Sequence, residues 1–298
     1  MFNEEITYIF PFVDPTDPHW IVEYTETMNT SNYVQQRHRD LGMLKYVFRG
    51  LAENMPWVKI GIILNYPSQV PKWLNTDLVR PIYLDEFIPE KYLPCFNSTT
   101  IEMYLSRIKG LTEYLIYGND DFFPMLPSSP SDYFTPSGLP KVSFSKSTSV
   151  KSSYKKHCKR IFDTVKESFP EINIPKGVYY RQKHFAQPMR LSTMKKVYNM
   201  YKNKIDRSIT TIRTLSVNFA QNIYYDYALL ARECEKVEPI GKFMDFKTST
   251  AEDVCNYIEN PDKAWFCLND NEYTKLSDIP KIISAFEAKF PEKCIYEL

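Results

Sequence analysis

Glycine is scarce in this chain, with only 8 among 298 residues. Neither a P-loop nor a GxGxxG motif occurs, so a bound phosphate would have to be held by side chains and a metal ion. No apolar run approaches the roughly 20 residues that span a bilayer, and the first residues, MFNEEITYIF, lack a basic region followed by a long apolar core. We therefore expect a cytoplasmic protein without a transmembrane segment, which leaves peripheral association with a membrane open.

An excess of either charge is also lacking, because 37 Lys and Arg face 36 Asp and Glu. This balance favours neither nucleic acid nor an anionic membrane as a partner, so any anion site must be local. Paired cysteines are missing as well. No CxxC motif occurs, and we expect reduced, packed thiols and no zinc site. The six cysteines are Cys95, Cys158, Cys234, Cys255, Cys267 and Cys294.

The stretch 93–126 joins a helical pattern to a strand pattern that ends in acids. Apolar residues recur at helical spacing over 99–111, with a Ser or Thr at 98–100 as the expected N-cap. The run Tyr114–Tyr117 predicts a buried strand. Ligands of open α/β sheets bind just beyond such strand ends, and oxygen ligands favour Mg²⁺ or Mn²⁺. The alternative is an ordinary polar turn. The polar residues that follow this strand are Asn119, Asp120 and Asp121.

Two further strand patterns also end in acids. Residues 6–13, ITYIFPFV, predict a first buried strand, and Asp14 and Asp17 follow it. Residues 264–269 predict a short apolar strand that leads into Asp270. A polar turn is the alternative in both places. The recurrence of strand followed by acid indicates that these segments contribute to one metal site.

The order strand, helix, strand, strand, helix, strand over the first 125 residues predicts an α/β fold. We expect a mostly parallel sheet within a three-layer, Rossmann-like core, to which further helices are added. A helical pattern beginning at Arg37 carries Arg39 and Arg49, whose guanidinium groups suit a diphosphate. A solvated, charged helix face is the alternative.

The string FNSTTIE, then RIKGL, then a strand ending in NDD resembles the second conserved region of the Stealth family. That family includes bacterial capsule-polymer hexose-1-phosphate transferases and the catalytic subunit of the animal N-acetylglucosamine-1-phosphotransferase. Met43 and Ser106 depart from the usual glutamate and histidine. The matching residues are Leu93, Pro94, Phe96, Asn97, Ser98, Ile101, Glu102, Arg107, Ile108, Gly110, Leu111, Asn119, Asp120 and Asp121.

Three other segments are similar to the remaining Stealth regions and occur in the family's order. The sequence VDPTDPHW at 13–20 resembles the first region, with Pro15 in place of glycine. His184, a nearby proline and the following helix resemble the third region, together with Arg213. The C-x-N-D-N pattern at 267–271 resembles the fourth.

The resemblance implies a core like that of type A glycosyltransferases and a sugar-1-phosphate transferase. Hexose-1-phosphate, with UDP-N-acetylglucosamine as the favoured donor, would move to a hydroxyl of a saccharide or glycan chain in surface polysaccharide synthesis. UMP would leave and a phosphodiester would form. His184 is the first choice as general base and Asp121 the second, while Arg213 would bind the phosphates. Mg²⁺ or Mn²⁺ would be held by Asn119, Asp120, Asp121 and Asp270. The donor-binding residues would be Asp14, Asp17, Arg37, Arg39, Arg49, Asn97, Ser98, Glu102 and Arg107.

The motifs divide the chain into parts with different expected roles. We expect residues 1–126 and 175–275 to form the catalytic core, and the Pro/Ser-rich 127–174 to form a surface excursion with a basic helix. Residues 276–298 are expected to form a helical lid. Two rival functions stay open. A glycosyltransferase of similar fold would release UDP, and a catalytically inactive carbohydrate-binding or scaffold protein would turn over no donor.

Overall fold

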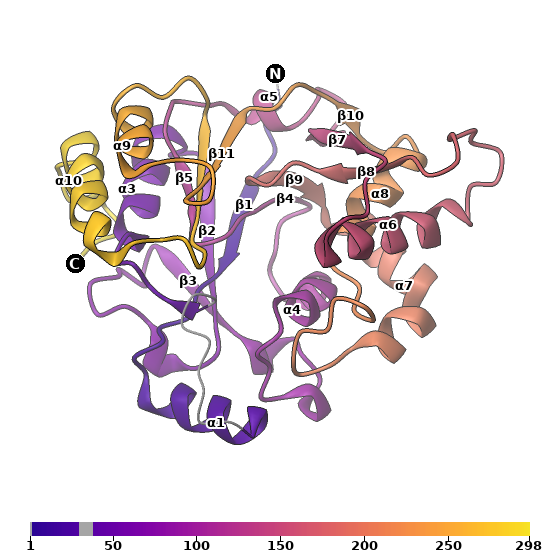
Figure 1. Cartoon of the computed structure of the whole chain (residues 1–298), viewed down its shortest axis with the longest axis horizontal. Helices are drawn as coiled ribbons and strands as arrows, with labels where there is room; N and C mark the ends of the chain where they lie inside the picture. Colours follow the sequence, from indigo (N-terminus) through magenta and orange to yellow (C-terminus); the bar gives the residue numbers. More distant parts are fainter. Residues whose placement is uncertain (1, 30–37) are drawn as a thin grey trace.

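A five-stranded sheet lies at the centre of the computed structural model, which describes residues 2–29 and 38–298 (Figure 1). Its strands are β1 (Ile6–Pro11), β2 (Val58–Leu64), β3 (Val79–Tyr83), β4 (Tyr114–Tyr117) and β9 (Gln187–Arg190). The spatial order is β3-β2-β1-β4-β9. The first four strands run parallel, and β9 runs antiparallel to β4. Their apolar residues are buried on both sides, as expected of a parallel sheet covered by helices.

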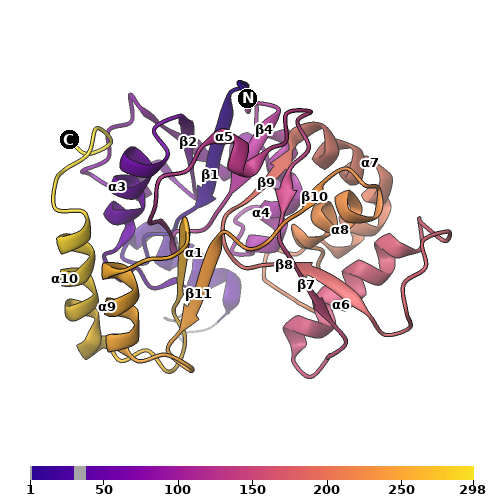
Figure 2. The same ribbon diagram turned by 90° about the horizontal axis from the view of Figure 1, so that it is seen from above.

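Helices cover both faces of this sheet and complete three layers. They are α3 (Leu44–Asn54), α4 (Ser98–Tyr104), α6 (Ser153–Lys166), α7 (Leu191–Ser208), α8 (Asn222–Leu230), α9 (Ala251–Glu259) and α10 (Ile279–Lys289). One core cluster joins the sheet to α3, α9 and α10, and the other joins it to α4, α6, α7 and α8. Figure 2 shows α3, α9 and α10 on one side of the strands and α6 to α8 on the other. The predicted α/β fold with a mostly parallel sheet is confirmed.

A second, smaller sheet begins where β4 ends. It contains β5 (Phe122–Pro124), β11 (Gly241–Asp245) and β12 (Trp265–Asn269), in the order β11-β12-β5. Strand β12 runs antiparallel to β5 and places Cys267 opposite Phe122. The other elements are α1 (Pro18–Met28), α5 (Pro130–Tyr133), β6 (Lys141–Val142), β7 (Phe144–Ser147), β8 (Tyr179–Gln182) and β10 (Glu235–Lys236). Over residues 2–29 and 38–298, no helix is both long enough and apolar enough to cross a membrane.

The predicted helices and strands are confirmed in their apolar parts. Several of them begin or end at other residues than the sequence predicts. The helix predicted over 99–111 begins at Ser98, because Asn97 is the N-cap, and its α-helical turns end at Tyr104. The helical pattern expected from Arg37 onward becomes α3 only at Leu44, so Arg39 lies in the preceding loop, while Arg37 lies outside the described residues. Strand β9 was not predicted, because its sequence QPMR contains a proline and has no apolar alternation.

Two expected peripheral segments are instead packed into the fold. Within the Pro/Ser-rich stretch, Tyr133 and Phe134 are completely buried, and Tyr133 Oη accepts a hydrogen bond from Trp265 Nε1 (2.7 Å). The expectation of a surface excursion is therefore wrong for this part. Helix α10 buries Ile282 and Phe286 against the core, so it forms a wall of the domain rather than a lid.

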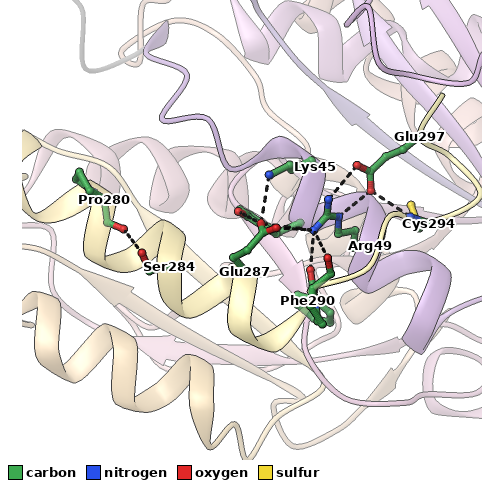
Figure 3. A network of polar contacts seen from close by, with 10 residues as sticks. Lys45, Arg49, Pro280, Ser284, Glu287, Phe290, Cys294 and Glu297 are labelled. Carbon is green, nitrogen blue, oxygen red and sulfur yellow. Dashed lines mark hydrogen bonds and ion pairs between the residues drawn. The ribbon is translucent and has the colours of Figure 1, made fainter.

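Arg49 links α3 to residues near the C-terminus of the chain (Figure 3). Its side chain is 7% exposed and forms a bidentate pair with Glu297, with Nε–Oε1 and Nη2–Oε2 distances of 2.7 and 3.1 Å. Nη1 donates to the carbonyl oxygen of Phe290 (2.7 Å). Because these acceptors occupy the guanidinium group, the prediction that Arg49 binds a diphosphate is wrong.

Removing one member of this buried pair should strongly destabilise the domain. We expect Arg49→Met to lower the free energy of unfolding by about 3–5 kcal/mol, because Glu297 would stay buried without a counter-charge. The double substitution Arg49→Met with Glu297→Met should recover most of the loss. Urea unfolding followed by circular dichroism measures both effects.

Lys59→Met is the matched control, since Lys59 pairs with Glu5 on the surface and both side chains are more than 60% exposed. An exposed pair contributes about 0–1 kcal/mol. Equal losses for Arg49→Met and Lys59→Met would contradict the anchoring role of Arg49.

Candidate active site

Acids from three separate segments meet at one edge of the central sheet. Strands β1 and β4 run parallel, so Asp14 beyond β1 and Asp120 and Asp121 beyond β4 lie at the same edge. The carbonyl oxygen of Asp121 accepts a hydrogen bond from Leu268 N (3.1 Å), which brings the end of β12 and the following Asp270 alongside. The ends of β1, β4 and β12 therefore lie close together, as the sequence predicts.

A pocket that is open to solvent lies beside Asp120 and Asp121. Asp40, from the loop before α3, also lines it and carried no signal in the sequence. Desolvation raises the pKa of Asp40, a hydrogen bond from Gly42 N partly opposes this, and repulsion by Asp14 adds to the rise. The other lining residues are Phe12, Leu41, Met43, Leu44 and Phe123.

Asp120 and Asp121 are unfavourable as neighbouring anions. Although part of the Asp120 side chain is exposed, desolvation and then repulsion by Asp40 raise its pKa to about 7. Desolvation and repulsion by Asp120 raise the pKa of Asp121 well above its usual range. Asp121 Oδ1 is buried and has no hydrogen-bond partner among the described residues. Such an oxygen is costly unless a proton or a cation neutralises it, so the two side chains fit a divalent ion.

His184 reaches this edge of the sheet from the loop between β8 and β9. Because β9 runs antiparallel to β4 with Gln187 opposite Tyr117, the residues just before β9 lie at the end of β4 that leads to the acids. The ligand atoms of His184 and Asp121 lie within 4.8 Å of each other. The helix expected after His184 is α7, and the structure adds the short strand β9 between them.

The surroundings of His184 keep its imidazole neutral near pH 7. Its ring packs against Phe122 and Phe243, with centroids 5.1 and 5.7 Å away. Burial, followed by the charges of Arg181 and Arg213, lowers the pKa of His184 to about 4. A neutral imidazole is able to accept a proton, as a general base must. Sequence reasoning missed Arg181 and Phe243, because a lone arginine and a lone phenylalanine in short strands carry no pattern.

The charge of Arg213 acts on both His184 and Glu102. The Arg213 side chain is exposed, and its charge lowers the pKa of both groups. Glu102 is buried on α4 and accepts a hydrogen bond from Gln221 N (2.7 Å). Desolvation raises the pKa of Glu102 to about 7 despite these two opposing effects. Glu102 is buried and bonded to the backbone at Gln221, so donor binding by Glu102 stays a prediction.

Arg39 and Asp270 bind each other. Arg39 Nε and Nη2 donate to the two carboxylate oxygens of Asp270, at 2.8 and 2.5 Å, and both side chains are mostly buried. In this arrangement, Arg39 compensates the charge of Asp270 close to Asp121. The predicted roles of Asp270 as metal ligand and Arg39 as diphosphate ligand would both require this pair to open.

Asn97 is buried completely and holds the loop that carries Arg213. Its Oδ1 accepts from Thr99 N (3.1 Å), which caps α4, and its Nδ2 donates to the carbonyl oxygen of Thr210 (3.0 Å). Asn97 also bonds with Asn218 Oδ1 (3.2 Å). A residue without exposed surface cannot contact a donor, so the donor-binding prediction for Asn97 is corrected to a positioning role.

Other predicted donor-binding residues lie at helix ends or on the surface. Asp17 is buried, caps α1 through His19 N (2.9 Å) and accepts a hydrogen bond from Ser68 Oγ (2.6 Å). Ser98 is the first residue of α4. Arg107 is exposed and lies over the ring of Tyr104, 5.4 Å from its centroid. These contacts give Asp17 and Arg107 local structural roles, while donor binding by Ser98 stays a prediction.

Ionisation of Glu102 should make the stability of the domain depend on pH. Its pKa is about 7 in the folded chain and near its ordinary 4.5 when unfolded, so its favourable contribution is complete below pH 4.5 and is lost as pH rises through 7. We expect Glu102→Gln to gain about 3 kcal/mol relative to the parent between pH 4.5 and 7.5. Urea unfolding at several pH values measures this difference.

Glu259→Gln, at an exposed position at the end of α9, serves as the control and should show no such trend. If the difference between Glu102→Gln and the parent stays constant across this pH range, Glu102 is not a strained buried acid.

Comparison with known proteins gives consistent relatives over the whole chain. Residues 37–142 match the family described as Stealth protein CR2, conserved region 2. An exopolysaccharide phosphotransferase of Lactiplantibacillus plantarum is 26% identical, covering 98% of this chain and 96% of the relative. A capsular polysaccharide phosphotransferase of Streptococcus pneumoniae is 24% identical, covering 98% of each. Among solved structures, mouse xyloside xylosyltransferase 1 is similar at a TM-score of 0.41 and 10% identity, covering 92% of this chain and 99% of that one.

The matched region contains the helix α4, the strand β4 and the acids Asp120 and Asp121 that the fold directs into the pocket. The relatives align along nearly the full length, beyond that region. The chain therefore contains conserved region 2 of the Stealth family, and along nearly its full length it is similar to bacterial polysaccharide phosphotransferases.

Proposed function

We propose that this chain is a polysaccharide phosphotransferase, an enzyme that transfers sugar phosphate during the synthesis of a surface polysaccharide. The proposal takes this class from the names of the relatives in Lactiplantibacillus plantarum and Streptococcus pneumoniae. In its finer form, hexose-1-phosphate moves from a UDP-sugar, with UDP-N-acetylglucosamine as the favoured donor, to a hydroxyl of a saccharide acceptor. UMP leaves and a phosphodiester remains.

One observation carries the proposal. Asp121 and a neutral histidine lie together at the end of the sheet, Asp120 precedes Asp121 in the same turn, and the charge of Arg213 acts on the histidine. Transfer of a phosphoryl group needs a cation at the phosphates and a base at the attacking hydroxyl. Both groups are within reach of a single substrate here.

Asp120 and Asp121 would hold Mg²⁺ or Mn²⁺, because their carboxylates supply oxygen ligands and none of the described residues that line the pocket is cationic. When bound, the ion neutralises phosphate charge and acts as a Lewis acid. Asn119 contributes an amide to the same turn. Asp14 and Asp40 add negative charge near these two carboxylates and would therefore raise the affinity of the site for a cation.

Side chains of the protein would carry out proton transfer and phosphate binding. An imidazole nitrogen of His184 accepts the proton of the acceptor hydroxyl, while the hydroxyl oxygen forms a bond with the β-phosphorus of the donor. The bond between that phosphorus and the oxygen of UMP breaks. The guanidinium group of Arg213 pairs with phosphate oxygens as charge develops on them. Because the anomeric carbon keeps all its bonds, the configuration of the sugar is retained.

The nucleotide released from a UDP-sugar tests the reaction class. With Mg²⁺ and a panel of UDP-sugars, we expect UMP as the product and a loss of turnover in Asp121→Asn. His184→Gln should slow transfer by roughly 10²–10⁴, the contribution of a general base. Chromatography of the nucleotides gives the identity and the rate.

The matched control is His19→Gln, since His19 is on the exposed surface of α1 and its imidazole pairs with Glu23. Circular dichroism shows that each variant folds. Release of UDP in place of UMP would indicate a glycosyltransferase, and full activity of Asp121→Asn would contradict the proposed site.

Phe243 offers a surface for the acceptor sugar. Its ring is 43% exposed and lies beside His184, where the acceptor hydroxyl must come. A sugar face packs favourably on an aromatic ring, so we expect Phe243→Ala to raise the acceptor KM roughly three- to tenfold, while Phe243→Trp preserves it. Slow UMP release to water, measured without acceptor, should not change.

Tyr273→Ala is the control for this substitution, because Tyr273 is 50% exposed and its ring lies under the ammonium group of Lys247. An acceptor KM that is equal in Phe243→Ala and the parent would show that the acceptor lies elsewhere.

A further inference from the structure

A thiol joins the acid and the imidazole at the end of β12. The side-chain ligand atoms of Asp121, His184 and Cys267 all lie within 4.8 Å of one another. Cys267 is completely buried, and its Sγ lies 3.8 Å from Asp121 Oδ2. The register of β12 against β5, which sets Cys267 opposite Phe122, produces this proximity between residues 146 positions apart.

The three donors are chemically different from the oxygen ligands expected for magnesium. A carboxylate, an imidazole and a thiolate together are a set that Zn²⁺ binds well, whereas Mg²⁺ requires oxygen. Three protein ligands with water in a fourth position is a common zinc arrangement. We propose that Asp121, His184 and Cys267 form a site for a soft divalent cation, Zn²⁺, which overlaps the proposed magnesium site.

Geometry and unsatisfied polar atoms both support a cation at this point. Zinc ligands lie about 2.0–2.3 Å from the metal and therefore about 3.5 Å from one another, so the cluster needs to contract by roughly an ångström. His184 lies in a loop, which has the freedom for such a shift. Asp121 Oδ1, buried and without a hydrogen-bond partner in the described chain, is a vacant ligand atom. The spacing of the cysteines in the sequence gave no indication of zinc. The other two ligands come from distant segments, which only the fold brings to Cys267.

Zinc at this position would inhibit the enzyme. The ion takes the imidazole that accepts the acceptor's proton and the carboxylate that holds magnesium, and Cys267 releases its thiol proton to solvent as it binds. This consequence rests on the proposed function, whereas metal binding itself does not. The two parts of the inference are therefore tested by separate measurements.

Co²⁺ is the probe for binding, because thiolate ligation to Co²⁺ gives an intense near-ultraviolet charge-transfer band. We expect the purified full chain to show this band, and added Zn²⁺ to remove it. Cys267→Ser should abolish the band and weaken Zn²⁺ binding at least about tenfold, since even substitution of a group outside the ligand sphere costs that much. Cys255→Ser, a buried cysteine packed against α10, is the matched control and should keep the band.

Circular dichroism establishes whether Cys267→Ser folds. If it does not, His184→Gln keeps the thiol and should retain a charge-transfer band but bind Co²⁺ at least about tenfold more weakly. Absence of the band in the parent, or its persistence in folded Cys267→Ser, would overturn the zinc site.

The inhibition is measured on UMP release at saturating Mg²⁺, with each variant compared with its own zinc-free rate. We expect Zn²⁺ to inhibit the parent and at least about tenfold more Zn²⁺ to be needed for Cys267→Ser. Binding without inhibition would overturn the inhibitory role. If no UDP-sugar yields UMP, the proposed function fails, and the Co²⁺ band alone still decides the zinc site.

Discussion

Repulsion between carboxylates held at one end of the sheet is the constraint on which the other features of the site depend. Asp120 and Asp121 cannot move apart, because β4 and β5 fix the backbone on both sides of them. Desolvation makes the charged form of each carboxyl group less favourable and thereby raises the pKa of both. A fold that keeps such a pair needs a counter-charge. Arg39 compensates the charge of Asp270, whereas Asp121 has no comparable cationic partner among residues 2–29 and 38–298.

The acids lie on strand ends, whereas the cations lie on loops. Arg213 is carried by a loop that Asn97 and Asn218 hold through buried hydrogen bonds, and Arg39 belongs to the segment before α3. Loops adjust their geometry more easily than strands within a sheet. This division would suit the proposed anionic substrate, since the rigid part would fix the metal ligands and the adaptable part would approach the phosphates.

The sheet and its acids were predictable because both depend on local patterns. Runs such as Val58–Leu64 and Tyr114–Tyr117 are apolar and short, and polar residues mark their ends. Burial of single polar residues was not predictable in this way. Asn97 and Arg49 belong to motifs that suggested ligand binding, yet tertiary contacts with Thr210 and Glu297 turn both inward. A motif identifies a residue type at a position, but only the packing decides which way it faces.

The same limit explains why Cys267 had no predicted role. Sequence reasoning judges a metal site by the spacing of like ligands, and the thiol, the imidazole and the carboxylate here come from segments 63 to 146 residues apart. Two antiparallel pairings, β4 with β9 and β5 with β12, bring them together at the end of β4. Each pairing involves a strand of three or four residues, too short for a reliable pattern. A site assembled by short pairings would therefore offer oxygen ligands to one metal and a mixed set to another, and the affinities and concentrations of the two ions would decide between them.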